Sequence, residues 1–364
     1  MPLLPDNSPK QRSIIIGAAL LVVFTLSCNE NPTKRALPHN GNPFGIEPQT
    51  VKIAAVGDMM FARGVALHMD SAGFDAPLRD VAEYLAEFDI TTGNLECPVS
   101  EFGAPMDKKY VFRADPAIIP HLVNAGFDVL TVANNHAFDY GLKCFCDGLV
   151  RLENGGIETV GGGVNLDEAL KVRIVDARGI KFGLLGFNDT KTNYIGKDRP
   201  ACAPAYEPWV FDAIRNARDR CDVLIVQIHW GEEYRLFPTE RQIELGRAMI
   251  DRGVDVVLGH HPHSWQGIEF YGGGLIAYSL GNFVFDQNDM MNNLTGILEM
   301  TFRGNELIDA RIRPIELLNS PKEAHFAHFP EAEIFFGYLT ESLLFTDTEV
   351  TRESEKFVLS PIGR

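Results

Sequence analysis

Short apolar runs of strand length alternate with amphipathic stretches along most of the chain. Five runs stop directly before polar side chains, and they span residues 51–56, 89–92, 129–132, 223–228 and 254–258. The amphipathic stretches have apolar positions at helical spacing, and they span residues 77–87, 116–125, 144–154 and 240–251. This alternation predicts an α/β fold in which helices cover the faces of a sheet.

Further strands are predicted in the second half of the chain. Residues 171–175 and 181–185, joined across 177–179, predict a hairpin. A meander that forms another sheet is predicted at residues 268–270, 275–278, 295–302 and 307–315. We expect the main domain to span residues 51–318, followed at 319–364 by a helical appendage with a helix at 331–345.

Two histidines follow the fifth predicted strand at once. His261 and His263 flank Pro262, whose ring stiffens the turn, so two imidazoles can be aimed at one place with little ordering cost. Imidazole is a common ligand of transition metals. Taken alone, the pair is equally compatible with ordinary histidines of a surface loop.

The other four predicted strands also end at side chains that metals or phosphates use. These side chains are Asp58 after the first strand, Asn94 and Glu96 after the second, Asn135 and His136 after the third, and His229 after the fourth. Each one alone fits a cap or a turn. Buried carboxyl and imidazole groups are costly unless they are paired or bind metal. The set therefore predicts one shared metal site at one edge of the sheet, with structural capping as the alternative.

The order of these motifs resembles the bacterial capsule-synthesis CapA family, also called the poly-γ-glutamate biosynthesis family. The motifs are Gly-Asp at 57–58, Gly-Asn-Leu-Glu at 93–96, Ala-Asn-Asn-His at 133–136, His-Trp-Gly-Glu-Glu-Tyr at 229–234, Gly-His-His-Pro-His at 259–263 with Gln266, and Tyr-Ser-Leu-Gly-Asn-Phe at 278–283. The resemblance covers residues 52–286. That family is similar to the calcineurin-like metallophosphoesterases, which implies a four-layer α/β/β/α sandwich with two metals at strand ends.

The resemblance also implies roles for individual residues. The implied metal ligands are Asp58, Asn135, His229, His261 and His263. The implied ions are one or two divalent metals, manganese, iron or zinc. His136, beside Asn135, is then the expected proton donor, with Asp139 as a partner that holds its tautomer. Arg63 is expected to donate to a phosphate or carboxylate group of a substrate, or else to be a charge on a surface helix.

Two positions depart from the metallophosphoesterase pattern. Met60 stands where a histidine is usual, and a thioether is a poor ligand for hard or borderline ions. Asn94 stands where a bridging aspartate is usual, but Glu96 follows two residues later. Because side chains two apart on a strand share a face, Glu96 could also reach the metals. One of the two metal positions could then be weak or absent.

The composition fits a folded protein that does not bind nucleic acid. The chain has 364 residues, 45% of them hydrophobic, which is ample for one large core. Its net charge of −16 argues against a nucleic-acid surface, which needs a basic patch. The chain has six cysteines, and the five after Cys28 allow up to two disulfides and one free thiol.

The N-terminus predicts a lipoprotein signal at residues 1–28. Lys10 and Arg12 precede an apolar run at 14–26, and the run ends before Ser27 and Cys28. This resembles a bacterial lipoprotein signal, in which Cys28 is lipidated and becomes the first mature residue. An uncleaved anchor is the alternative, although the run is shorter than the ~20 residues of a spanning helix. Residues 29–50, rich in Asn, Pro and Gly, predict a flexible tether.

Two kinds of function remain open. The first is a metal-dependent hydrolase, similar to phosphoesterases, that acts in capsule or poly-γ-glutamate biosynthesis outside the cytoplasm. The second is a non-catalytic accessory that binds polymer or partner proteins in a degenerate metallophosphoesterase cleft. The expected partners are a surface polymer or its precursors, membrane proteins of synthesis or export, and the membrane itself through the lipid anchor. Met60 and Asn94 favour the accessory, whereas the histidines favour the hydrolase.

Overall fold

A computed structural model describes residues 49–190, 198–287, 289, 291–318 and 323–362. The predicted signal at 1–28 and residues 29–48 of the predicted tether lie outside these residues. The chain divides into a unit at Met1–Glu47 and a unit at Pro48–Arg364, and only the second is described below. Among the described helices, none combines the length and the apolar character needed to cross a membrane.

The larger sheet has ten strands. Eight follow the order β17-β18-β15-β14-β1-β2-β3-β4, and β13 pairs with β1 while β16 pairs with β15. Their bounds are β1 Thr50–Met59, β2 Ile90–Leu95, β3 Phe127–Thr131, β4 Glu158–Val160, β13 Asn282–Val284, β14 Leu294–Arg303, β15 Glu306–Leu318, β16 Glu323–Phe326, β17 Thr348–Glu353 and β18 Lys356–Pro361. Strands β1 to β4 are parallel, so their carboxyl ends lie at one edge.

The smaller sheet has six strands in the order β11-β12-β10-β9-β7-β6. Their bounds are β6 Arg173–Ala177, β7 Ile180–Asn188, β9 Val223–His229, β10 Val256–His260, β11 Ile268–Tyr271 and β12 Gly274–Ala277. Strands β6 and β7 form the predicted hairpin. A separate two-stranded pair joins β5 (Gly162–Gly163) to β8 (Ala201–Cys202).

The predicted second meander does not form one sheet. Strands β11 and β12 belong to the smaller sheet, where β12 runs parallel to β10. Strands β14 and β15 belong to the larger sheet, where β14 pairs with β1. An apolar run indicates that a strand is buried but not which strand it pairs with. The sequence pattern therefore predicted one sheet for strands that lie in two.

Successive side chains on a strand point to opposite faces of its sheet, and this alternation explains how the two sheets pack. In β1, Ile53 and Ala55 belong to the core that both sheets share, whereas Ala54 and Val56 face the helices on the other side. In β9, Ile225 likewise lies in the shared core, and its neighbours Leu224 and Val226 belong to a third core. Both faces of these strands are therefore buried, which accounts for their nearly continuous apolar runs.

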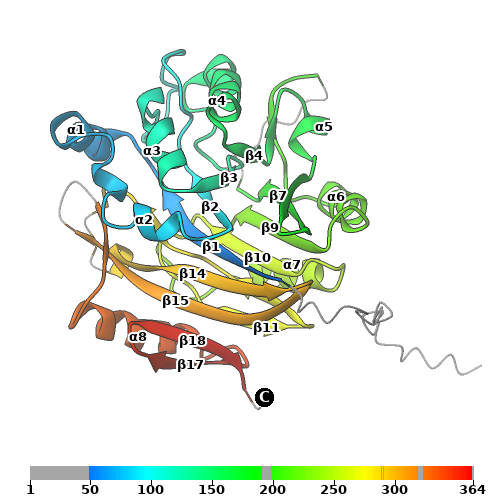
Figure 1. Ribbon diagram of the computed structural model, residues 1–364. Coiled ribbons are helices and arrows are strands. Elements are labelled where there is room, and N and C mark those ends of the chain that lie inside the picture. The colour runs from blue at the N-terminus through cyan, green and yellow to red at the C-terminus, as the bar shows by residue number, and fades with distance from the viewer. Residues whose placement is uncertain (1–48, 191–197, 288, 290, 319–322, 363–364) are drawn as a thin grey trace, which may run out of the picture. The chain divides into compact units, whose positions relative to one another are not determined.

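Helices cover the outward faces of the two sheets (Figure 1). On the larger sheet lie α1 Arg63–Ala72, the 3-10 turn η1 Ala76–Leu78, α2 Ala82–Leu85, η2 Pro116–Ile118, α3 Ile119–Asn124 and α4 Gly141–Gly155. On the smaller sheet lie α5 Leu166–Ala169, α6 Trp209–Arg218 and α7 Glu240–Ile250. The helical stretches at 116–125, 144–154 and 240–251 are confirmed, whereas 77–87 is broken into η1 and α2.

The start of α7 shows why the sequence folds locally as predicted. The Thr239 hydroxyl accepts from the backbone N–H of Gln242, and the Gln242 side chain accepts from the backbone N–H of Thr239. This capping box satisfies two backbone donors that a helix start otherwise leaves unpaired. Helix α6 was not predicted from the sequence, and no side chain caps its first turn.

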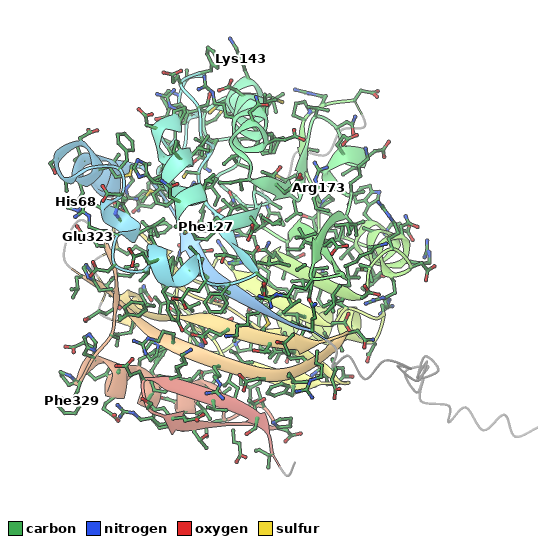
Figure 2. All side chains as sticks on the ribbon, in the orientation of Figure 1. His68, Phe127, Lys143, Arg173, Glu323 and Phe329 are labelled. Atoms are coloured by element: carbon green, nitrogen blue, oxygen red, sulfur yellow. The ribbon has the colours of Figure 1, made fainter. Side chains whose placement is uncertain are left out.

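The region after residue 318 is more than a helical appendage. Helix α8 spans Glu331–Ser342, within the predicted helix, but three further strands, β16, β17 and β18, join the larger sheet. Figure 2 shows Glu323 of β16 beside His68 of α1, and the two side chains are hydrogen-bonded. The C-terminal region is therefore tied both to the sheet and to its covering helices.

The cysteines of the described chain are free thiols. They are Cys97, Cys144, Cys146, Cys202 and Cys221. Burial raises the pKa of Cys97 and of Cys202 to about 12. Since the thiolate is the reactive form, both thiols are expected to be inert in the native protein.

Alkylation followed by mass spectrometry tests this expectation. Treated with iodoacetamide at pH 8, the native protein should remain unmodified at Cys97 and Cys202 and react there only after unfolding. Cys146, which is only partly buried, is the internal comparison. Native modification of Cys97 as fast as that of Cys146 would contradict the prediction.

Candidate metal centre

The strand-end residues come from both sheets and meet between them. Asp58 and Asn94 end β1 and β2 of the larger sheet, and His229 and His260 end β9 and β10 of the smaller one. The expectation of a single sheet edge is therefore corrected. Strand β9 pairs with β10 and with β7, and β10 also pairs with β12. Neither β9 nor β10 pairs with β1 to β3, and their ends face the first group across the shared core.

An irregularity in β1 turns Asp58 into this space. Ala55 pairs with Thr92 and Asp58 pairs with Asn94, so β1 advances three residues while β2 advances two. One extra residue reverses the side-chain parity, as in a β-bulge. Asp58 consequently faces the same side as Asn94, whereas a regular strand would have turned it toward the helices.

Glu96 lies at the centre of the cluster. Its Oε1 atom is buried without a hydrogen-bond partner. The Nε2 atoms of three histidines surround it, His263 at 3.8 Å and His136 and His229 at 3.9 Å. These distances are too long for hydrogen bonds, but ligand atoms bound to one ion at about 2.0–2.1 Å lie roughly 3–4 Å apart.

The donor set fits one or two divalent cations. The candidate ligand atoms form two groups, and within each group the atoms lie within 4.8 Å of one another. One group contains Glu96, His229 and His261, and the other contains Asp58, Glu96 and His263. Glu96 is common to both groups. The Nδ1 atom of His261 is also buried without a partner. Buried polar atoms of this kind without partners fit a cation-binding site better than structural packing.

Asn94 and Asn135 present different atoms to the cluster. Asn94 accepts from Asn134 Nδ2 at 3.1 Å through Oδ1, which turns its own Nδ2 toward Asp58 Oδ1 at 2.8 Å. In this orientation Asn94 donates to carboxylates instead of offering an oxygen to a metal. Asn135 Oδ1, by contrast, lies 3.0 Å from His229 Nε2, at the edge of the first ligand group.

The loop with His261 and His263 is held in place by its backbone. Both residues have positive φ angles, 97° and 58°. The backbone N–H of His261 donates to Asp58 Oδ2 at 3.1 Å, and His263 Nδ1 lies 2.9 Å from Asn282 Oδ1. A left-handed conformation at two residues that are not glycine is strained, and such strain persists where surrounding contacts impose it.

His136 forms the predicted pair with Asp139. Its Nδ1 lies 2.6 Å from Asp139 Oδ2, so Nε2 is left facing Glu96. Phe112 stacks on the His136 ring at 4.0 Å and donates its backbone N–H to the same Asp139 oxygen at 2.8 Å. Lys108 also contacts the Asp139 carboxylate. These contacts fix the orientation of the imidazole.

Arg63 lies beside the cluster and is paired. Its guanidinium contacts both oxygens of Asp286, at 2.8 and 3.1 Å, and lies over the rings of Tyr110 and Phe112. Asp286 also accepts from the backbone N–H of Gly64 at the start of α1. Arg63 therefore lies near the site, but its guanidinium is already paired with the carboxylate of Asp286.

Met60 does not face the cluster, whereas a neighbouring histidine lies beside Asp58. Met60 is buried in the core beneath the helices, and its sulfur accepts from the backbone N–H of Ala62 at 3.1 Å. His260 is fully buried with Nδ1 at 3.3 Å from Asp58 Oδ1. Neither His260 nor Asn282 was predicted from the sequence as a site residue. His260 could have been predicted from the alternation of side chains along a strand. Residues 256, 258 and 260 share a face, and Val256 and Leu258 lie in the core that both sheets share.

Burial and neighbouring charges shift the pKa values of the cluster in different directions. Burial raises the pKa of Asp58, but hydrogen bonds and charge from His260 and His263 outweigh it and hold the pKa well below its usual range. Burial and the charge of Asp58 raise the pKa of Glu96 well above its usual range. Burial and nearby imidazoles lower the pKa of His229, and that of His261 to about 4. At neutral pH these histidines are therefore uncharged, the form in which imidazole binds metal.

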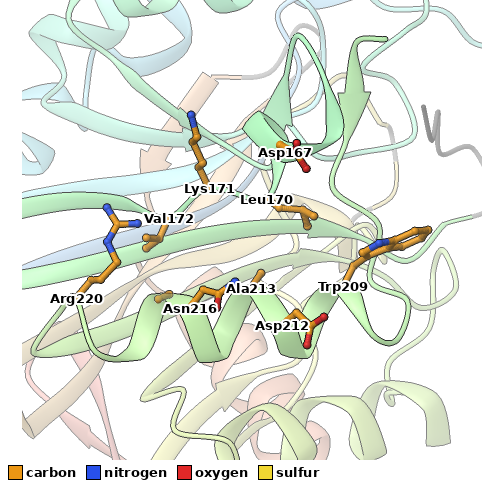
Figure 3. Close-up of a pocket in the computed structure, with 10 residues that line it drawn as sticks. Asp167, Leu170, Lys171, Val172, Trp209, Asp212, Ala213, Asn216 and Arg220 are labelled. Carbon is orange, nitrogen blue, oxygen red and sulfur yellow. The ribbon is translucent and has the colours of Figure 1, made fainter. Parts of the chain in front are cut away.

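A hollow elsewhere on the protein has no part in this cluster. It has a volume of about 290 Å³ and lies between α5 and α6 (Figure 3). Its polar lining residues include Asp167, Lys171 and Asp212, and none of the strand-end donors lines it. The strand-end cluster is accordingly the candidate functional site.

Comparisons with known proteins agree with the motif order. The family described as "Bacterial capsule synthesis protein PGA_cap" matches residues 52–287. "PGA biosynthesis protein CapA" of Bacillus subtilis (strain 168) is 34% identical over 268 residues, covering 72% of this chain and 70% of that protein.

Two further relatives extend the comparison. "Capsule biosynthesis protein CapA" of Bacillus anthracis is 33% identical over 291 residues, covering 76% of this chain and 70% of that protein. "Probable polyglutamine synthesis accessory protein Rv0574c" of Mycobacterium tuberculosis (strain ATCC 25618 / H37Rv) is 27% identical and covers 54% of this chain and 56% of that protein. The motif order, the family match and this degree of identity show that the chain belongs to the bacterial capsule-synthesis CapA family.

Proposed function

We propose that this protein acts in the biosynthesis of a capsule or of poly-γ-glutamate at the bacterial surface. The support comes from the family and from the names of the two Bacillus relatives, of which this chain spans 70% each. The acidic charge of the chain agrees with a protein that does not bind nucleic acid. The expected partners are a surface polymer or its precursors and membrane proteins of synthesis or export.

The proposal includes a divalent-metal site in a four-layer α/β/β/α sandwich of the metallophosphoesterase type. The single observation that carries it is the buried, unpartnered Glu96 Oε1 with three imidazole Nε2 atoms at 3.8–3.9 Å. Glu96, Asp58, His229, His261 and His263 would hold the metal. Glu96, which belongs to both groups of candidate ligand atoms, would supply the carboxylate that Asn94 does not.

The chemistry that fits this arrangement is hydrolysis of a phosphoester or a related bond. A bound divalent ion supplies Lewis-acid polarisation of the scissile group and of water. His136 would donate a proton to the leaving oxygen from Nε2 when its ring is protonated, and Asp139, which accepts from Nδ1–H, would orient the ring and stabilise its positive charge. Asn135, whose Oδ1 lies beside His229, would help to orient the ligands.

A non-catalytic accessory is the second candidate function. It is favoured by the position of Met60, whose thioether packs in the core beneath the helices and offers the cluster no ligand. The amide nitrogen of Asn94 also points at the carboxylates where an aspartate oxygen would be expected. A protein of this kind would bind polymer or partner proteins in the same cleft without turnover.

Activity and metal content measured together on the purified protein separate the two candidates. The hydrolase proposal expects bound manganese, iron or zinc and turnover of bis(p-nitrophenyl) phosphate that a chelator abolishes. Bound metal without turnover on phosphodiester, phosphomonoester or γ-glutamyl substrates would favour the accessory. Absence of metal after reconstitution would refute the metal site itself.

We also propose that the protein is extracytoplasmic and anchored to the membrane by lipid at Cys28. The support is the basic start, the short apolar run and the polar stretch that follows Cys28. More than one acyl chain, at ~0.8 kcal/mol per buried CH₂, would anchor the protein stably without a spanning helix.

Replacement of Cys28 tests the anchor. The Cys28→Ser variant is expected to accumulate as a precursor or to leave the detergent-phase membrane fraction, as judged by fractionation and mass spectrometry. Cys146→Ser, which changes a cysteine inside the folded unit, is the matched control and should remain anchored. An intact N-terminus that still carries residues 14–27, or a mature protein cut elsewhere, would show that the lipoprotein prediction is wrong.

A further inference from the structure

Tyr234 is an exposed aromatic residue held in a strained conformation beside the candidate metal centre. Its side chain is 57% exposed, and its φ angle is 63°. Its ring lies 6.0 Å from the ring of His263, and its backbone N–H donates to the carbonyl oxygen of Pro262 at 2.8 Å. A left-handed residue that is not glycine persists where surrounding contacts impose it, and such residues cluster at sites that bind ligands.

The loop that carries Tyr234 is fixed by a buried glutamine. Gln266 is fully buried, and its Nε2 donates to the backbone carbonyl oxygens of Arg235 at 3.0 Å and Phe237 at 3.3 Å. Its Oε1 accepts from Gln242 Nε2 at 2.9 Å. The interior of the protein therefore imposes the position of Tyr234, although the exposed side chain of this residue adds little to the core.

A buried asparagine is hydrogen-bonded to His263 on the other side of its ring. Asn282, the first residue of β13, is fully buried, and its Nδ2 donates to the backbone carbonyl oxygen of Asn292 at 3.4 Å and to Gln287 Oε1 at 3.0 Å. Because a carbonyl oxygen only accepts, Asn282 must turn Oδ1 toward His263 Nδ1, at 2.9 Å. His263 therefore carries its hydrogen on Nδ1, and Nε2, which faces Glu96, is left in the form that binds metal.

The same chain of hydrogen bonds ends at the hydroxyl of Tyr234. Because Gln287 Oε1 accepts from Asn282, the amide nitrogen of Gln287 faces Tyr234, whose hydroxyl oxygen accepts at 3.2 Å. A phenol has one hydrogen to donate, and among the described residues no acceptor for it lies within hydrogen-bonding distance. Each bond in such a chain polarises the next. The donors all run from His263 toward Tyr234, and the last O–H is available to a ligand.

Tyr234 lines a pocket of about 690 Å³, a volume within the range of small-molecule sites. Arg63 also lines this pocket, but its guanidinium is paired with Asp286, so the attraction for an anion would come from a bound divalent ion. Tyrosine hydroxyls are among the neutral donors that stabilise negatively charged oxygens in enzyme sites. A ligand with an anionic oxygen fits a divalent ion with a neutral O–H donor beside it.

We propose that Tyr234 binds an anionic oxygen of the ligand at the metal centre, and that Asn282 and Gln287 position its hydroxyl. The inference deepens the proposed function, on which it rests, because it names a residue that contacts the ligand beyond the metal ligands. The Tyr234 O–H donates to a phosphate or carboxylate oxygen while its ring remains beside His263. Asn282 and Gln287 do not touch the ligand and act through Tyr234.

Calorimetry on the purified full-length protein, reconstituted with metal, tests the proposal with two probes. One probe is inorganic phosphate, and the other is a γ-linked glutamate oligomer, which carries carboxylates and no phosphate. Tyr234→Phe keeps the ring and removes only the hydroxyl, so it should keep the metal. It should weaken the probe that binds about tenfold or more, which is the usual effect of losing a hydrogen bond to a charged group.

A matched control and a double-mutant cycle make the result interpretable. Tyr206→Phe, at a tyrosine that is 37% exposed and does not line the pocket, should bind both probes as the unchanged protein does. Gln287→Met should weaken the same probe, because the Tyr234 hydroxyl is no longer held. If Gln287 acts through that hydroxyl, the double variant should bind no more weakly than Tyr234→Phe alone. Additive losses would overturn the positioning role of Gln287.

The outcomes separate this inference from the proposed function. Binding of either probe that falls in Tyr234→Phe supports the inference, and the probe that binds identifies the group as phosphate or carboxylate. Binding of neither probe, or equal binding by Tyr234→Phe and Tyr206→Phe, would overturn it. Metal content is measured on the same samples. Metal without any effect of Tyr234→Phe would refute the inference alone, whereas binding that depends on Tyr234 without metal would refute the metal centre alone.

Discussion

Replacement of His261 by alanine is expected to leave the purified protein with almost no bound divalent metal. His261 belongs with Glu96 and His229 to one group of ligand atoms, and its Nδ1 is buried without any other partner. The unchanged protein is expected to bind about one to two manganese, iron or zinc ions per chain. Plasma mass spectrometry of the two proteins, each after the same reconstitution, measures the loss.

The two ligand groups allow a finer test of the same site. Glu96→Gln should lose more metal than either histidine variant, because Glu96 is common to both groups. His263→Ala should remove the ion shared with Asp58 and weaken the other. His121→Ala is the matched control, since this histidine of α3 stacks on Phe74 and contacts no candidate ligand. Metal lost from the control to the same extent would mean that global destabilisation, and not ligand removal, explains the effect.

The second large effect is expected at His136. His136→Ala should keep the fold and the metal but lower any hydrolytic turnover by about 10²–10⁴, the usual contribution of general acid catalysis. The physical reason is its position, with Nδ1 held by Asp139 and Nε2 directed at Glu96 from 3.9 Å. Steady-state rates on bis(p-nitrophenyl) phosphate, together with metal content, give both readouts.

A variant of the partner carboxylate distinguishes proton transfer from simple packing. Asp139→Asn should reduce turnover less than His136→Ala, because the imidazole remains but loses the carboxylate that orients it and stabilises its protonated form. His136→Gln should behave like His136→Ala if the proton matters, whereas it should restore activity if only the volume matters. Loss of metal in the His136 variants would reassign His136 to the metal ligands.

Much of the candidate site was predictable because it lies where local patterns end. The apolar runs before Asp58, Asn94, Asn135 and His229 are all strands in the structure. Strand parity also correctly predicted that Asn94 and Glu96 share a face, as their side chains lie 3.3 Å apart. The orientation of Asp58 could not be predicted from strand parity, because the extra residue in β1 depends on pairing with β2, which the sequence of β1 alone does not reveal.

The sequence by itself determined which segments are buried strands and which polar groups follow them, since burial and period are properties of neighbouring residues. The tertiary structure alone decided that β11 and β12 join one sheet while β14 and β15 join the other. It also decided that Asp286 pairs with Arg63, and that Glu323 of β16 pairs with His68 of α1. These outcomes depend on contacts between residues far apart in the chain. The residues of an apolar run do not indicate which strand or side chain the run will contact.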